Sequence, residues 1–144
     1  MGARAGEAEG ARARRILIVD DDRLLAETLR MMIADFAASE VALEIADDVM
    51  TSGLEAARRL EALTNDAPTH DLVVCDLSMP GVDGLTLYEG LVARGSPLAR
   101  RFVLVTGGAF TPAAAAAIAR HALPCLQKPF DSAKLAETLR PFFA

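Results

Sequence analysis

Short apolar runs alternate with stretches of helical periodicity along this chain, and this alternation limits the folds that it can adopt. Apolar runs occupy residues 16–19, 72–75 and 102–105, and a weaker run covers residues 124–127. Between them, apolar side chains recur every three or four positions, which is typical of helices that bury one face. Continuous apolar runs of this length predict strands of a parallel sheet that is covered on both sides.

A fifth strand is expected where Val41, Leu43 and Ile45 alternate with less apolar neighbours, as on a half-exposed edge strand. Five strands then alternate with five helices. The pattern predicts an α/β, doubly wound (βα)5 flavodoxin-like fold, with a five-stranded parallel sheet in the order 2-1-3-4-5 and helices on both faces. Helix starts are expected after Asp22, after Thr111, which precedes Pro112, and after Asp131.

Composition excludes several classes of function. Of 144 residues, 52% are hydrophobic, which suffices for the core of one domain. The net charge is −5, and the first fifteen residues carry an excess of arginine, so the remaining body is acidic and unsuited to direct nucleic-acid binding. Residues 1–13 are expected to form a flexible tail before a domain at 14–144. No apolar run is long enough for a membrane helix. A cytoplasmic protein is expected because the two cysteines cannot make a disulfide framework.

The cysteines and histidines offer no separate site. Cys75 and Cys125 are interpreted as reduced core residues. His70 and His121 have no second histidine or cysteine at ligand spacing, and both are expected at the surface or at its boundary.

Polar side chains follow four of the expected strands. The residues concerned are Asp20, Asp21 and Asp22 after the first strand, Asp76 after the third, Thr106 after the fourth and Lys128 after the fifth. The carboxyl ends of parallel strands meet at one edge of a sheet, so these groups are expected to converge. Asp20, Asp21 and Asp76 would repel one another without a cation, and Mg²⁺ prefers such oxygen ligands. Asp76 is the best candidate for a nucleophile in phosphoryl transfer.

Four sequence stretches resemble the signatures of response-regulator receiver domains. They are Ile-Leu-Ile-Val-Asp20-Asp21-Asp22, Val74-Cys75-Asp76-Leu-Ser-Met-Pro80-Gly-Val-Asp83-Gly84, Val103-Leu-Val-Thr106-Gly107 and Gln127-Lys128-Pro129-Phe130. All four occur in the family's order, each at a strand end, and the resemblance covers roughly residues 14 to 143. One stretch alone would be weak, but the set is specific.

The resemblance implies a role for each matching residue. Asp76 matches the phosphoacceptor, Asp21 a direct metal ligand and Asp20 a ligand that acts through water. The backbone carbonyl of Ser78 matches the third ligand of a Mg²⁺ (or Mn²⁺) ion. Thr106 matches the hydroxyl that moves toward the phosphoryl group. Lys128 matches the cation that pairs with a carboxylate or a phosphoryl oxygen. The peptide bond between Lys128 and Pro129 is expected to be cis, as is common in the family.

The resemblance also implies a partner and an output. A histidine kinase or phosphotransfer protein would phosphorylate Asp76, and the face built from the fourth helix, fifth strand and fifth helix would then change its affinity for a downstream protein. Such a domain catalyses only its own phosphorylation and dephosphorylation, and is expected as a monomer or weak dimer. Both a stand-alone receiver and one from a hybrid histidine kinase fit the sequence.

Two positions depart from the family pattern. Cys125 stands where an aromatic residue often rotates with the switch, and Gly108 leaves little side chain beside the phosphoryl site. The first departure leaves open an alternative, a constitutive interaction module that does not depend on phosphorylation. A phosphatase of the haloacid-dehalogenase type is set aside, because Ser78 occupies the position where those enzymes need a second aspartate.

Overall fold

The computed structural model describes residues 14–41, 44–62, 70–107 and 111–143. The expected tail at 1–13, Leu43 and Gly108 lie outside these residues. Five parallel strands form one sheet in the order β2-β1-β3-β4-β5, which confirms the predicted topology. The strands are β1 (Arg14–Val19), β2 (Ile45–Met50), β3 (Leu72–Asp76), β4 (Phe102–Thr106) and β5 (Cys125–Gln127).

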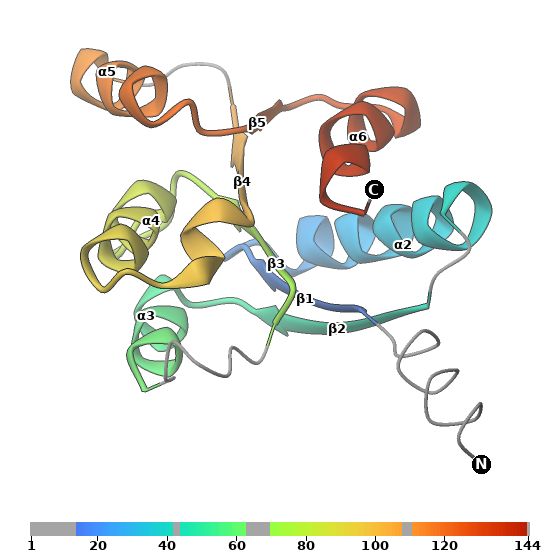
Figure 1. The fold of residues 1–144 in the computed structure, drawn as a ribbon, viewed down its shortest axis with the longest axis horizontal. Helices are drawn as coiled ribbons and strands as arrows, with labels where there is room; N and C mark the ends of the chain where they lie inside the picture. The colour runs from blue at the N-terminus through green and yellow to red at the C-terminus, as the bar shows by residue number, and fades with distance from the viewer. Residues whose placement is uncertain (1–13, 42–43, 63–69, 108–110, 144) are drawn as a thin grey trace.

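Helices cover both faces of this sheet (Figure 1). They are α2 (Arg23–Glu40), α3 (Gly53–Glu61), α4 (Gly84–Ala93), α5 (Pro112–His121) and α6 (Ser132–Leu139), with 3-10 turns η1 (Pro97–Arg100) and η2 (Arg140–Phe142). Helices α2 and α6 lie on one face, and α3, α4 and α5 lie on the other.

The core is divided by the sheet into two clusters. In β1, Ile16 and Ile18 pack toward α2 and α6, whereas Leu17 and Val19 pack toward α3 and α4. All four side chains are fully buried, as expected of a central parallel strand. Burying an aliphatic side chain of this size stabilises the fold by about 1.5–3 kcal/mol, so this strand fixes the sheet on which the polar edge is built.

Polar caps begin the helices where the sequence predicts them. The side chain of Asp22 accepts a hydrogen bond from the amide of Leu25, that of Thr111 from the amide of Ala114, and that of Asp131 from the amide of Lys134. Each cap satisfies an amide that the first helical turn leaves free. The side chain of Asp22 thus serves as the N-cap of α2.

The edge strand lies later in the chain than predicted. An alternation of Val41, Leu43 and Ile45 was expected to form it, but β2 runs from Ile45 to Met50 and contains Asp47 and Asp48. The two acids are tolerated because cations from other elements reach them, with Arg30 at 3.8 Å from Asp47 and Arg15 at 2.8 Å from Asp48. Local alternation does not reveal such long-range pairing.

Two further expectations about single residues are wrong. His70 is buried rather than at the surface, and its Nε2 lies 2.7 Å from Oδ2 of Asp48. Cys125 is exposed rather than a core residue, because it lies in the short edge strand β5, whereas Cys75 in the central strand β3 is buried as expected.

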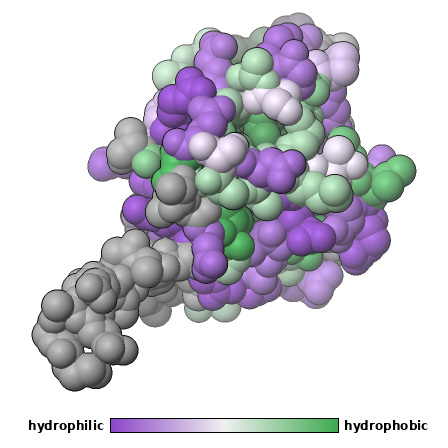
Figure 2. Space-filling model, turned by 90° about the vertical axis from the view of Figure 1, so that its right-hand side faces the viewer, coloured by the Kyte–Doolittle hydropathy of each residue, from purple (hydrophilic) through white to green (hydrophobic). Residues whose placement is uncertain are grey.

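The surface over α2 and α6 is mostly hydrophilic, with hydrophobic residues in small separate areas (Figure 2). In α2, Leu24 and Met31 are the large hydrophobic side chains most exposed to solvent. Among the described residues, no helix has the length and apolarity needed to cross a membrane.

Candidate functional site

The predicted polar residues meet beyond the carboxyl ends of the strands, and backbone hydrogen bonds set their places. The amide of Asp20 donates to the carbonyl of Met50 at 3.0 Å, and the amide of Lys128 donates to the carbonyl of Thr106 at 2.7 Å. These bonds extend the β1–β2 and β4–β5 pairings by one residue each. The side chains after neighbouring strands are therefore held at one edge of the sheet.

Asp76 is the last residue of β3 and is buried, with 5% of its surface exposed. The Nζ atom of Lys128 lies 2.8 Å from its Oδ1 atom, in a partly buried ion pair. A carboxylate held in this way has one oxygen neutralised and is fixed in orientation.

Asp20 and Asp21 lie beside Asp76. One carboxylate oxygen from each of the three residues lies within 4.8 Å of the other two. Asp20 is buried and Asp21 is exposed, so the cluster has a closed and an open side. Three carboxylates therefore share the single ammonium group of Lys128, and the site keeps an excess of negative charge.

The pKa of Asp20 is raised above its ordinary value of 3.8, first because burial disfavours the charged carboxylate and then because Asp76 and Asp21 repel it. A hydrogen bond from the amide of Asp22 to Oδ1 of Asp20, at 2.9 Å, and the charge of Lys128 act in the opposite direction. The folded protein thus holds Asp20 where its charge is unfavourable without a further cation.

The donor set fits a small divalent cation. It consists of carboxylate oxygens only, close enough for two or three of them to contact one ion, with one open side for water or substrate. Hard oxygen ligands of this kind suit Mg²⁺, which retains several waters and accepts one or two carboxylates.

Thr106 and Ser78 occupy the expected elements at this edge. Thr106 ends β4 and is buried, and its hydroxyl has no hydrogen-bond partner among the residues described. Ser78 is exposed in the loop after β3. The Lys128–Pro129 peptide bond is cis, as the resemblance implies.

Gly84 supports the site in a way that the sequence does not reveal. It begins α4, and its amide donates to the carbonyl of Leu77 at 3.0 Å. A Cβ atom at this position would lie 2.5 Å from the carbonyl oxygen of Asp76 and 2.8 Å from Cδ2 of Leu104. In the sequence, the only sign of this role is a glycine directly after Asp83. Such a pair indicates a turn, but it does not show that the backbone of Asp76 lies against the glycine.

Sequence comparison finds one protein family that matches most of the chain. The sequence model of the response regulator receiver domain matches residues 16–140. The C4-dicarboxylate transport transcriptional regulatory protein DctD of Pseudomonas aeruginosa is 34% identical over 127 residues, which are 88% of this chain and 24% of that protein. The transcriptional regulatory protein FixJ of Azorhizobium caulinodans is 32% identical over 124 residues, which are 85% of this chain and 52% of that protein. The chain therefore spans about a quarter to a half of these curated relatives.

Solved structures share the fold. A putative response regulator from Chloroflexus aurantiacus has a TM-score of 0.66 and 25% identity, over 92% of this chain and 98% of that chain. The receiver domain of sensor histidine kinase PA1611 from Pseudomonas aeruginosa PAO1, solved with a magnesium ion coordinated in its active-site cleft, has a TM-score of 0.67 and 19% identity, over 92% of this chain and 98% of that chain.

Proposed function

Since this chain is a member of the response regulator receiver domain family of two-component systems, we propose that it works as a phosphorylation switch whose phosphoacceptor is Asp76. The observation that carries this proposal is the 2.8 Å pair between Lys128 and Asp76 inside a cluster of three carboxylates. The donor would be a histidine kinase or a phosphotransfer protein. The domain itself would catalyse only its own phosphorylation and dephosphorylation.

Asp20, Asp21 and Asp76, together with the backbone carbonyl of Ser78, would hold a Mg²⁺ or Mn²⁺ ion. When bound, the ion would supply positive charge for the phosphoryl oxygens and for the crowded carboxylates. The raised pKa of Asp20 and the open side at Asp21 support this assignment.

The transfer itself needs little from the protein except position and charge. A carboxylate oxygen of Asp76 would attack the phosphorus of a phosphohistidine, the phosphorus–nitrogen bond would break, and the imidazole would leave with the electron pair. The ammonium group of Lys128, which contacts Oδ1 of Asp76 in the structure, would then donate to a phosphoryl oxygen, and the Thr106 hydroxyl would donate to another. Thr106 is suited to this step because its hydroxyl has no other partner in the part of the chain that the structure describes.

The new charge would then change the surface formed by α5, β5 and α6, on which a downstream protein would bind. Ala117 is the only buried residue of α5, so little packing holds this helix in one position. A shift of Thr106 at the end of β4 could therefore move α5 at small cost. The acidic body supports a receiver that does not itself contact nucleic acid. The receiver would work in the cytoplasm as a monomer or weak dimer.

One observation favours a second candidate, a constitutive interaction module. Cys125 is an exposed, small residue at the position where the family often has an aromatic side chain that follows the threonine. A domain without that relay could bind its partner in the same way with or without phosphate. The two candidates differ in whether phosphorylation changes partner binding, and first in whether Asp76 is phosphorylated.

The test is chemical phosphorylation with acetyl phosphate, followed by intact-mass measurement. We expect the parent protein to gain one phosphoryl group in the presence of Mg²⁺ and none with EDTA. Asp76→Asn should gain none, whereas Asp83→Asn, changed at a helix cap outside the cluster, should behave as the parent does. No gain in the parent, after Mg²⁺ binding has been confirmed and with a cognate kinase as donor, would favour the constitutive module.

A further inference from the structure

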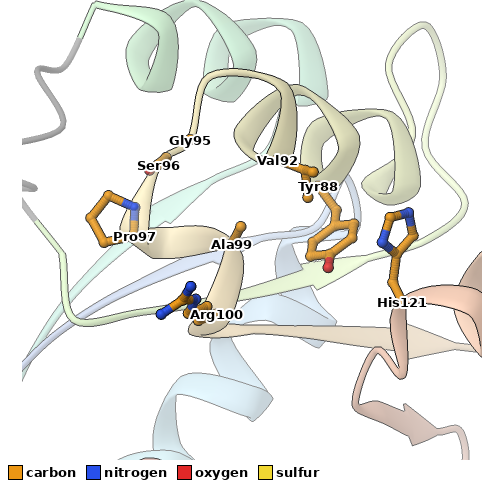
Figure 3. Close-up of a pocket in the computed structure, with 8 residues that line it drawn as sticks. All are labelled: Tyr88, Val92, Gly95, Ser96, Pro97, Ala99, Arg100 and His121. Carbon is orange, nitrogen blue, oxygen red and sulfur yellow. The ribbon is translucent and has the colours of Figure 1, made fainter.

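A cavity of about 500 Å³ opens between α4, η1 and the end of α5 (Figure 3). It is lined by Tyr88, Val92, Gly95, Ser96, Pro97, Ala99, Arg100 and His121. None of these residues belongs to the acidic cluster or to the proposed phosphoryl site. Its volume lies within the range of small-molecule sites in proteins, so the cavity is large enough for a ligand of its own.

The charge of this cavity is opposite to that of the molecule as a whole. The chain carries −5, yet none of the described residues that line the cavity is acidic, and Arg100 contributes a guanidinium group. Among the described residues Arg100 has neither an ion pair nor a side-chain hydrogen bond, whereas Arg120 nearby is paired with Glu89 at 3.8 Å. An unneutralised guanidinium beside a cavity without acids favours an anionic group.

The remaining wall includes two aromatic rings and aliphatic surface. The rings of Tyr88 and His121 meet edge to face, with centroids 5.1 Å apart. In Figure 3, Tyr88 stands between Ala99 and His121, while Pro97 and Arg100 lie toward the other end. Val92 adds an aliphatic side chain that is 41% exposed. His121, Val92 and the 6% of Tyr88 that is exposed thus offer aromatic and aliphatic surface to a small apolar body whose charged group reaches Arg100.

We propose that this cavity binds a small aromatic carboxylate, with the carboxylate on the guanidinium of Arg100 and the ring against Tyr88 and His121. One planar guanidinium matches one planar carboxylate through two parallel hydrogen bonds. The occupant would contact both α4 and α5, because Tyr88 lies in the first helix and His121 ends the second. This binding does not require phosphorylation of Asp76.

The test is a titration of the full chain with 2-naphthoate, followed by two-dimensional amide NMR, with 2-naphthamide as the uncharged probe of the same shape. We expect saturable shifts at the residues around the cavity, and about tenfold weaker binding both for 2-naphthamide and in an Arg100→Gln variant. Arg58→Gln removes an exposed arginine from α3 instead and should bind as the parent does. Val92→Trp, at an exposed position on the rim, should block the probe without altering the fold.

Three results would overturn the proposal. One is the absence of saturable shifts at millimolar 2-naphthoate. Another is equal affinity for the acid and the amide, which would leave no role for an anion. The third is undiminished binding in both Arg100→Gln and Val92→Trp, which would place the probe elsewhere. Each result is independent of whether Asp76 is phosphorylated, so the two proposals can fail separately.

Discussion

The Nζ atom of Lys128 lies 2.8 Å from Oδ1 of Asp76, although 52 positions separate the two residues in the chain. Two neighbouring pairings make this contact possible, since β3 pairs with β4 and β4 pairs with β5. Among the residues described, the ammonium group of Lys128 is the only cation that forms an ion pair with a carboxylate of Asp20, Asp21 or Asp76. Lys128 is therefore the residue whose substitution should change the chemistry of the site most directly.

A Lys128→Gln variant should accept a phosphoryl group from acetyl phosphate more slowly than the parent, by about tenfold or more, because no fixed ammonium group would neutralise the phosphoryl oxygens. The rate is measured from the growth of the phosphorylated species in the intact mass at saturating Mg²⁺. Lys134→Gln, changed at an exposed residue of α6, is the control. An unchanged rate in Lys128→Gln would contradict the assigned role.

An Asp20→Asn variant should be more stable than the parent without metal. Burial and the neighbouring carboxylates raise the pKa of Asp20, so its ionisation opposes folding, and this contribution to the free energy of unfolding falls as the pH rises from 3.8 through the folded-state pKa. We expect a gain on the order of 1 kcal/mol at neutral pH in EDTA, measured by urea unfolding. The asparagine oxygen can still accept the amide hydrogen bond of Asp22.

Added Mg²⁺ should reverse this order, because it stabilises only a folded state that binds it, and the variant has lost one ligand. Asp35→Asn, at an exposed position of α2, should show neither effect. A variant that is less stable than the parent in EDTA would show that the charge of Asp20 is already compensated.

His70 should make the stability depend on pH. Burial lowers its pKa below the ordinary value of 6.5, although the hydrogen bond to Asp48 acts the other way. The unfolded chain then binds the proton more readily, so this contribution to stability is complete above about pH 6.5 and is lost as the pH falls toward the folded-state pKa.

A His70→Gln variant should flatten that part of the profile, because glutamine can donate to Asp48 but does not titrate. The measurement is the midpoint of urea unfolding at a series of pH values, with His121→Gln as the matched control for the other histidine. Parallel profiles for the parent and His70→Gln would refute the assignment.

Gly84→Ala should destabilise the protein, even though alanine favours helices. Its Cβ atom would lie 2.5 Å from the carbonyl oxygen of Asp76, so the end of β3 or the start of α4 must move, at a cost of about 1–3 kcal/mol. Gly90→Ala in the same helix meets only Nη1 of Arg94, at 3.4 Å, and should be neutral or stabilising by up to about 1 kcal/mol. Thermal unfolding of both variants checks this difference, and equal effects would contradict it.

The strands and the residues of the acidic edge could be predicted because both have local signals, and the sheet order followed from the rules of doubly wound folds. Apolar runs such as residues 102–105 mark central strands, and the polar residue that follows each run marks the edge where ligands bind. The contact between Lys128 and Asp76 follows from that topology together with the family resemblance.

The same reasoning failed where a residue depends on partners that are distant in the chain. Asp48 lies inside a strand because Arg15 pairs with its charge and His70 forms a hydrogen bond with it, and neither pairing has a local signature. His70 was expected near the surface and is buried, because its partner Asp48 is also distant in the chain. The contact between Gly84 and the backbone of Asp76 was missed for a similar reason, since a glycine shows no partner in the sequence.

The most direct measurement locates the phosphoryl group. The protein is phosphorylated with acetyl phosphate and Mg²⁺, the acyl phosphate is reduced with borohydride to homoserine, and the modified peptide is sequenced by mass spectrometry. The account predicts homoserine at position 76 and at no other aspartate. Homoserine at Asp20 or Asp21, with Asp76 unmodified, would contradict the central claim that the carboxylate paired with Lys128 is the phosphoacceptor.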